Sequence, residues 1–206
     1  MSPAGTGPRQ EVPARGRPRS EAVERAIIEG VMKLLEDGVP LAELSIERIA
    51  RTAGVGKATI YRRWSGKEEL FVDVMRAAEP PDPELPGTSM RDDLVVLLES
   101  LRLRGLAGRT SAILHHVRAQ MKSSPNLWAA YHDTVLVPRR TLGLDVLRRG
   151  RENGELRADV DIELLNDIVV GPVLVRTVMR PDADLPDDLA ERVVDTLLQG
   201  LRPVGT

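Results

Sequence analysis

The chain has 206 residues and a formal net charge of −2, a length that fits one large or two small domains. It contains no cysteine, which excludes a disulfide framework, a thiolate metal site and a cysteine nucleophile. Aromatic residues make up 2%, so the core has to be aliphatic, and no apolar run approaches the roughly 18 residues of a membrane-spanning helix. We therefore expect a cytoplasmic protein, without a signal peptide, that is built from helices.

The chain begins with a segment, residues 1–19, that is poor in hydrophobic residues and rich in Pro, Gly and Arg, so we expect it to be disordered. Residues 20–36 then repeat apolar side chains at helical spacing, which predicts a first helix ended by Gly38. Its expected buried stripe is Val23, Ile27, Val31, Leu34 and Leu35.

Residues 45–64 read as two short helices joined by a glycine turn. Ser45 is a good N-cap, because its hydroxyl can accept a hydrogen bond from an amide of the first turn. One apolar face follows at three- and four-residue spacing, and Gly54 stands where the chain must reverse. This face consists of Ile46, Ile49, Ala50 and Ala53.

The second of these helices opens around Gly56 and Lys57. At about 100° per residue, Ile60 and Trp64 fall on its inner face, so Trp64 is expected in the core. The remaining positions point outward or to the flanks, and they combine a small residue, hydroxyl groups and guanidinium groups. Such a face suits the major groove of DNA, where Arg can bind guanine and hydroxyls can bind phosphate. The outward and flanking positions are Ala58, Thr59, Tyr61, Arg62 and Arg63.

The charge pattern agrees with a nucleic-acid partner. Residues 45–67 carry six basic side chains against Glu47 alone, and residues 1–20 carry four Arg against one Glu, so the rest of the chain is net acidic. A basic, solvated face on an ordinary helical hairpin is the alternative. The asymmetry favours a DNA-facing head on an acidic body.

Residues 46–70, IERIARTAGVGKATIYRRWSGKEEL, resemble the DNA-binding segment of TetR-type transcriptional repressors. The family pattern is close to I-x-x-I-A-x-x-A-G-V-S-x-x-T-[IL]-Y-x-x-[FW]-x-[SN]-K-E-x-L. Gly56 and Gly66 depart from it, since Ser is more usual at both positions. Past Leu70 the resemblance rests on layout alone.

The resemblance implies an all-α fold with a three-helix head and a C-terminal helical bundle for ligand binding and dimerisation. It also implies a double-stranded DNA operator as partner, with a flexible basic arm beside the helix-turn-helix; a merely solubilising tail is the alternative for the arm. The expected DNA-binding residues are Arg15, Arg17, Arg19, Ser45, Lys57, Ala58, Thr59, Tyr61, Arg62, Arg63 and Lys67.

The next helix is expected from Ser65, as N-cap with Glu68 reaching back in a capping box, to about Glu79. Residues 80–88 form a Pro-rich linker. We thus divide the chain into the arm, residues 1–19, a helix-turn-helix domain, residues 20–66, and a sensing and dimerisation domain, residues 67–206.

The body is predicted to be helical throughout. Helices are expected over about 89–104, 109–122, 125–152, 162–179 and 187–200, with Ser124 and Asp161 as N-caps. Pro138 either kinks or splits the third of these. The fourth is apolar most of the way round, so it is either central or covered by a second subunit. By resemblance, the last two helices pack against those of a partner; the expected interface residues are Leu164, Ile168, Val175, Val193 and Leu197.

A small hydrophobic effector is the expected ligand of the body, held by a few polar or aromatic anchors. Trp128 and His132, at i and i+4, share a helix face; the alternative is that Trp128 only fills the core. The candidate ligand-binding residues are His115, Met121, Trp128, Tyr131 and His132. We expect no metal site, because adjacent His115 and His116 point in different directions on a helix and cannot bind one ion together. We also expect no cofactor.

The sequence contains no nucleophile elbow, paired-carboxylate helix motif or nucleotide-binding glycine loop, so no catalytic residues are expected. The interpretation is a dimeric, ligand-responsive repressor that binds a palindromic operator. An all-helical interaction protein, or a nonspecific DNA binder without an effector, is the alternative.

Overall fold

The computed structural model describes residues 17–111, 114, 117, 121 and 124–201. Every regular element in this part of the chain is helical, as predicted. The α-helices are α1 (Arg17–Glu36), α2 (Ile46–Thr52), α3 (Lys57–Tyr61), α4 (Lys67–Ala78), α5 (Met90–Thr110), α7 (Pro125–Tyr131), α8 (Val137–Glu152), α9 (Ile162–Leu174) and α10 (Leu189–Leu201). A 3-10 turn, η1 (Leu41–Glu43), and two π-helical segments, η2 (His132–Leu136) and η3 (Val175–Met179), complete the list.

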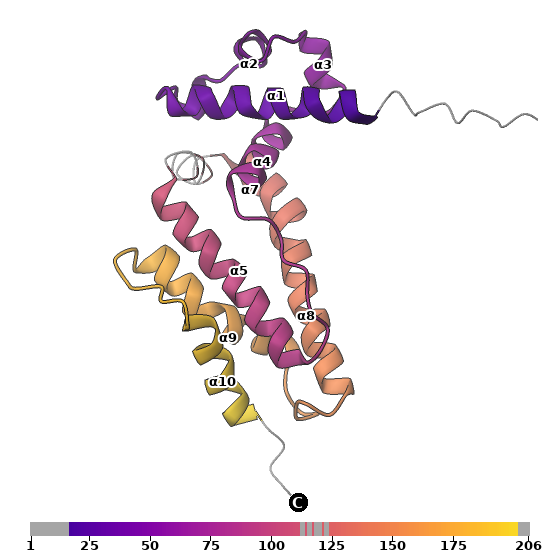
Figure 1. Cartoon of the computed structure of the whole chain (residues 1–206), viewed down its shortest axis with the longest axis vertical. Coiled ribbons are helices and arrows are strands. Elements are labelled where there is room, and N and C mark those ends of the chain that lie inside the picture. Colours follow the sequence, from indigo (N-terminus) through magenta and orange to yellow (C-terminus); the bar gives the residue numbers. More distant parts are fainter. Residues whose placement is uncertain (1–16, 112–113, 115–116, 118–120, 122–123, 202–206) are drawn as a thin grey trace, which may run out of the picture.

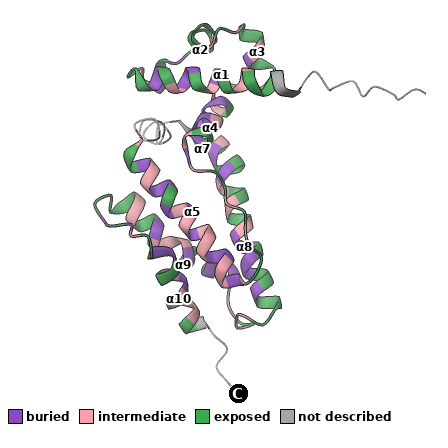
Figure 2. Cartoon of the chain, viewed as in Figure 1, coloured by how far each residue is buried: buried purple, intermediate pink, exposed green. Residues whose placement is uncertain are grey.

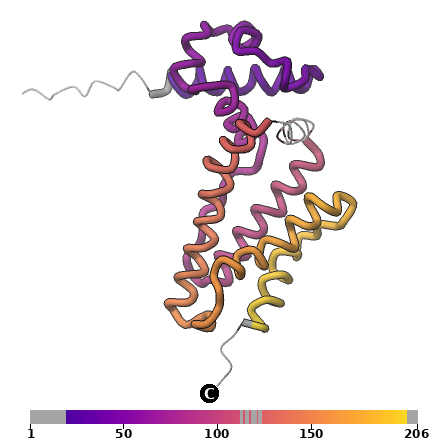
Figure 3. The backbone as a smooth tube through the Cα atoms, turned by 180° about the vertical axis from the view of Figure 1, so that it is seen from behind, coloured from indigo at the N-terminus to yellow at the C-terminus, as the bar shows by residue number. Residues whose placement is uncertain are grey.

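Helices α1, α2 and α3 form a head at one end of the molecule, and α5, α8, α9 and α10 form an elongated body (Figure 1). Helix α4 leads from the head into the body, and the view from behind shows the same two-part arrangement (Figure 3). Helix α4 therefore connects the two parts of the molecule.

The head has an aliphatic core that continues into α4 and α7 (Figure 2). The predicted stripe of α1 is confirmed for Ile27, Val31, Leu34 and Leu35, which are buried, whereas Val23 is partly buried. Phe71 of α4 and Leu127 and Tyr131 of α7 belong to the same cluster. One apolar cluster therefore spans the head, α4 and α7.

The body has its own apolar cluster between α5, α8, α9 and α10. Helix α5 runs on to Thr110, whereas the sequence predicted an end near Arg104. A Cβ on Gly105 would lie 2.2 Å from Thr177 Cγ2, so glycine is needed there for close approach between α5 and η3. The glycine therefore serves helix packing and does not end the helix. Most of the helix expected over 109–122 lies outside the described residues.

Two helix starts also differ from the prediction. Gly66, not Ser65, is the N-cap of α4, and the backbone N–H of Ser65 donates to Glu69 Oε2 at 2.7 Å. The side chain that reaches back is thus Glu69 rather than Glu68, one position later than expected. Helix α10 begins at Leu189, slightly later than predicted.

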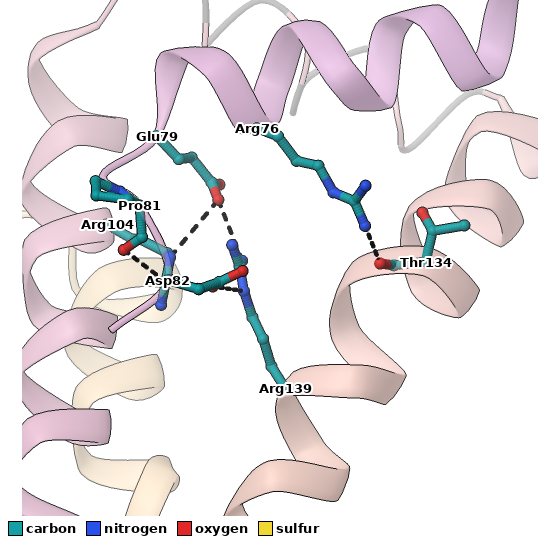
Figure 4. A network of polar contacts seen from close by, with 7 residues as sticks. All are labelled: Arg76, Glu79, Pro81, Asp82, Arg104, Thr134 and Arg139. Carbon is teal, nitrogen blue, oxygen red and sulfur yellow. Dashed lines mark hydrogen bonds and ion pairs between the residues drawn. The ribbon is translucent and has the colours of Figure 1, made fainter. Parts of the chain in front are cut away.

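Pro138 lies in the first turn of α8, and the π segment η2 joins α7 to α8 just before it. Proline has no N–H, so it cannot donate to the carbonyl four residues earlier, which is that of Thr134. Arg76 of α4 supplies a donor to this carbonyl instead (Figure 4). The chain therefore remains helical through residues 125–152 with a local change of winding.

Candidate nucleic-acid interface

Helix α2 is capped and turned as the sequence predicted. The Ser45 hydroxyl accepts a hydrogen bond from the backbone N–H of Arg48 at 3.2 Å. Ile49 and Ala50 are buried, and Gly54 has a φ of 67°, a left-handed conformation that favours glycine. The N–H of Val55 closes the turn by donating to the carbonyl of Ala50 at 2.9 Å. The chain is thereby redirected into α3.

Helix α3 follows this turn with Gly56 as an N-cap that has no side chain to offer. Ile60 and Trp64 are buried in the head core, as predicted for the inner face. We call α3 the reading helix. The indole N–H of Trp64 donates to Asp73 Oδ2 of α4 at 2.7 Å, so the aromatic ring is anchored in the core as well as buried. This anchoring leaves the opposite face of α3 directed away from the head.

The opposite face of the reading helix is open. Lys57, Ala58, Tyr61 and Arg62 are exposed. Tyr61 is 58% exposed, although most of its side chain is apolar. Thr59 is half-buried, and its hydroxyl accepts a hydrogen bond from Arg62 Nη2 at 3.3 Å. A hydroxyl and a guanidinium are thus held next to each other on an outward surface.

Two lysines flank this surface. Lys57 Nζ lies 3.2 Å from Glu47 Oε2, and both side chains are exposed, so the pair is weak and solvent-screened. Lys67, in the first turn of α4, is half-buried with its ammonium group 5.7 Å from the centre of the Phe71 ring. Both lysines therefore keep a cation close to the reading helix.

Arg63 differs from Arg62, because its guanidinium is hydrogen-bonded to other groups of the head. Nη1 donates to the carbonyl of Thr59 at 3.1 Å, and Nη2 donates to the carbonyl and the hydroxyl of Ser20, both at 3.2 Å. The sequence placed Arg63 on the same flank as Thr59 and did not foresee the contact with Ser20. A separation of 43 residues along the chain carries no local signal for such a contact.

The basic arm falls largely outside the described residues, and Arg15 with it. Arg17 and Arg19, which the sequence assigned to the disordered arm, lie in the first turn of α1. The boundary between arm and helix is therefore earlier than predicted.

The candidate ligand-binding residues are not brought together in the described part of the chain. Met121 and Tyr131 belong to the core shared by the head and α7, and His115 lies outside the described residues. Trp128 is 48% exposed and His132 is exposed, with their rings 6.2 Å apart. The two rings share a helix face, as predicted, but the alternative that Trp128 fills the core is wrong. The reason is that Leu127 and Tyr131 take the inward face of α7.

A small apolar cavity of about 10 Å³, room for roughly one water molecule, lies elsewhere, in the body. This is below the ~300–1,000 Å³ typical of small-molecule sites. Its lining is Leu94, Leu147, Leu156, Leu165, Val169, Val194, Leu197 and Leu198. Among the described residues, no group of three or more His, Asp or Glu side chains is placed to hold a metal ion.

The predicted interface residues divide into two groups. Leu164, Ile168 and Val175 are exposed on α9 and η3, whereas Val193 and Leu197 of α10 are half-buried against the body core. Val178 and Met179, 74% and 76% exposed, extend the apolar surface. We call the set Leu164, Ile168, Val175, Val178 and Met179 the outer face of α9.

A charged network connects α4 and the linker to the body, and no pattern in the sequence predicted it (Figure 4). Glu79, almost fully buried, lies 3.1 Å from Arg139 Nη1 and 3.8 Å from Arg104 Nε. Asp82 Oδ1 accepts from Arg104 Nη2 at 2.6 Å and from Arg139 Nε at 2.9 Å. Burial, together with the neighbouring Arg139, lowers the pKa of Arg104. Two carboxylates and two guanidinium groups thus fix the end of α4.

Comparison with known proteins adds family information to this geometry. Residues 27–74 match the bacterial regulatory proteins of the tetR family, and residues 86–197 match the tetracyclin repressor-like C-terminal domain. The HTH-type transcriptional regulator YdeS of Bacillus subtilis is 28% identical over 91% of this chain and 94% of its own. A DNA-binding transcriptional repressor named TetR from Mycobacteroides abscessus is 28% identical over 90% and 94%, respectively.

Solved structures share the fold. The flavonoid-responsive regulator FrrA superposes with a TM-score of 0.63 over 90% of this chain and 100% of its own, at 20% identity. Among the described residues, no helix combines the length and the apolarity needed to cross a membrane.

Proposed function

Since the chain belongs to the TetR family of bacterial transcriptional regulators, we propose that it is a ligand-responsive repressor that binds a palindromic operator as a homodimer. Operator binding, dimer formation and effector release are the three parts of this proposal. The relative from Mycobacteroides abscessus that carries the name of a repressor supports the direction of regulation.

The exposed face of α3 is the observation that carries the proposal. Burial of Ile60 and Trp64 leaves Lys57, Ala58 and Arg62 on the side away from the head. We infer that this side enters the major groove, where a small residue permits close approach and a guanidinium can take guanine O6 and N7. Arg62 is the proposed base-reading residue, because it is exposed and, among the described residues, its guanidinium donates only to the Thr59 hydroxyl, at 3.3 Å.

The remaining contacts are proposed by chemistry and position. Ala58 and Thr59 would meet base edges, whereas Tyr61, Lys57 and Lys67 would bind phosphate oxygens. Ser45 is proposed at the DNA side of α2, and the arm residue Arg15 beside the reading helix. Lys67 is placed at the start of α4, where a helix N-terminus also favours an anion.

Dimer formation is supported by the outer face of α9. Five exposed apolar side chains lie along one helix, whereas the exposed face of α10 is polar, with Glu191, Arg192 and Thr196. Apolar patches on protein surfaces commonly mark interaction sites. Pairing of this face with its copy would be isologous and would place two heads on a palindrome.

The effector is proposed to be a small apolar molecule that binds in the body. FrrA, described as flavonoid-responsive, has the same fold, so the fold accommodates ligands of this kind. The effector would release the operator if it bound more tightly to a dimer whose head spacing does not fit the operator than to one whose spacing does.

A gel-shift titration tests the proposal, with the protein and the duplex from upstream of its own gene at several salt concentrations. A selective shift that weakens steeply with salt is expected, because phosphate contacts release counterions. A shift of equal strength on unrelated duplexes would instead indicate a nonspecific DNA binder. A dimer in solution that shifts neither duplex would favour a helical interaction protein.

A further inference from the structure

Arg63 connects the end of the reading helix to the beginning of α1. Its guanidinium reaches the Thr59 carbonyl on one side and both oxygens of Ser20 on the other. Its Nε atom is buried without an acceptor among the described residues, whereas the two contacts with Ser20 lie at the surface of the head. A guanidinium held in this way has few donors left for a phosphate.

The C-terminal end of the reading helix depends on contacts with the rest of the head for its stability. The helix spans only Lys57–Tyr61, and an isolated helix of five residues is unstable in water. The backbone N–H groups of Arg63 and Trp64 both donate to the Ile60 carbonyl, at 2.9 and 3.0 Å. The guanidinium of Arg63 gives the Thr59 carbonyl a donor, and its positive charge suits a helix C-terminus.

The other end of the contact lies at the start of α1, where Ser20 is in the first turn. A contact between Ser20 and Arg63 therefore sets the distance between the end of the reading helix and the beginning of α1.

We propose that Arg63 is a positioning residue of the DNA-binding head. It holds the C-terminal end of the reading helix against the start of α1, so that the reading helix meets the duplex in a fixed orientation, and it makes no phosphate contact of its own. The inference rests on the proposed function, in which α3 enters the operator. Arg62, one residue earlier and exposed, is the matched comparison.

The test uses a duplex that the wild-type protein selects from a random library. Binding is measured across a salt series for wild type, Arg63→Ala, Arg63→Lys and Arg62→Ala. We expect Arg63→Ala to weaken specific binding roughly tenfold, because three charge-assisted hydrogen bonds are lost, while the salt slope stays at its wild-type value. A lost phosphate contact in each subunit would instead reduce the slope by about 1.8.

Arg63→Lys separates the two roles even if Arg63→Ala folds poorly. Lysine keeps the charge but cannot span Thr59 and Ser20 with a planar fork. Positioning predicts that Arg63→Lys binds as weakly as Arg63→Ala; retention of wild-type affinity by the lysine variant would overturn the proposal.

Hydrogen exchange gives a readout that does not depend on DNA. Arg63→Ala should raise amide exchange in residues 57–64 and leave the core of α1, residues 27–35, protected. Unchanged exchange in residues 57–64 would contradict the positioning role. Failure of the wild type to select any duplex would contradict the proposed function instead. The exchange comparison would still show whether Arg63 stabilises residues 57–64.

Discussion

The guanidinium of Arg76 in α4 donates a hydrogen bond to the backbone carbonyl of Thr134, the oxygen that Pro138 leaves without its helical donor. Arg76 also donates to Asp73 Oδ1 at 3.5 Å, and the other oxygen of Asp73 accepts from the indole of Trp64. These polar contacts run from the end of the helix-turn-helix, through α4, to the π segment of the body. Head and body are thereby linked at a point where the backbone of the body departs from regular helix.

Arg76→Ala should weaken this junction. The Thr134 carbonyl would lose its charged donor, but the site is exposed, so we expect a loss of about 1 kcal/mol in the free energy of unfolding. Amide exchange within His132–Leu136 should increase, and chemical denaturation with hydrogen-exchange mass spectrometry measures both effects. Arg148→Ala, which breaks only an exposed pair with Asp145, is the control and should change stability by less than about 0.5 kcal/mol.

Glu79→Gln should cost more stability than Arg76→Ala. Glu79 is almost fully buried, and after its neutralisation Arg104 and Arg139 keep their ion pairs with the Asp82 carboxylate. We expect the free energy of unfolding to fall by about 2 kcal/mol. This is less than the ~3–5 kcal/mol lost when one partner of a fully buried ion pair is removed, because Asp82 still compensates one charge. Urea unfolding checks the value. Equal stability of Glu79→Gln and wild type would show that the network does not fix the end of α4.

The head was largely predictable from the sequence because its signals are local. The Ser45 cap, the left-handed Gly54 and the inward Ile60 and Trp64 follow from spacing within a few residues, and the structure confirms each. The shift of the α4 cap from Ser65 to Gly66 shows the limit of such signals. Two adjacent residues can both act as N-caps, and the sequence alone does not choose between them.

The junction and the body were less predictable because their contacts are distant in the chain. The bond from Arg76 to Thr134 spans 58 residues, and that from Arg139 to Glu79 spans 60. Trp128 was misplaced for a related reason: helical spacing puts it beside His132 but does not say which face of α7 is buried. The partners of α7 decide that, and α4 is the principal one.

Arg62 and Lys67 should respond differently to substitution, if one reads a base and the other binds phosphate. Arg62→Ala is expected to cost about 1–3 kcal/mol in operator binding and to relax specificity at one base pair of each half-site. Lys67→Ala should weaken all duplexes alike and reduce the salt slope by about 0.9 per subunit. Binding of both variants to the selected duplex and to single-base variants measures the difference. Unchanged binding by both would mean that another surface contacts DNA.

The outer face of α9 should control the oligomeric state. Ile168 lies on this face, so Ile168→Glu would place two charges in a symmetric pair, since an isologous interface repeats every substitution. We expect a monomer by analytical ultracentrifugation, with an unchanged far-UV circular dichroism spectrum, because Ile168 is already exposed within one subunit. Operator affinity should fall as well, since each head would bind its half-site alone. Thr196→Glu, on the exposed polar face of α10, is the matched control and should remain dimeric. If Thr196→Glu disrupted the dimer and Ile168→Glu did not, α10 rather than α9 would have to form the contact between subunits.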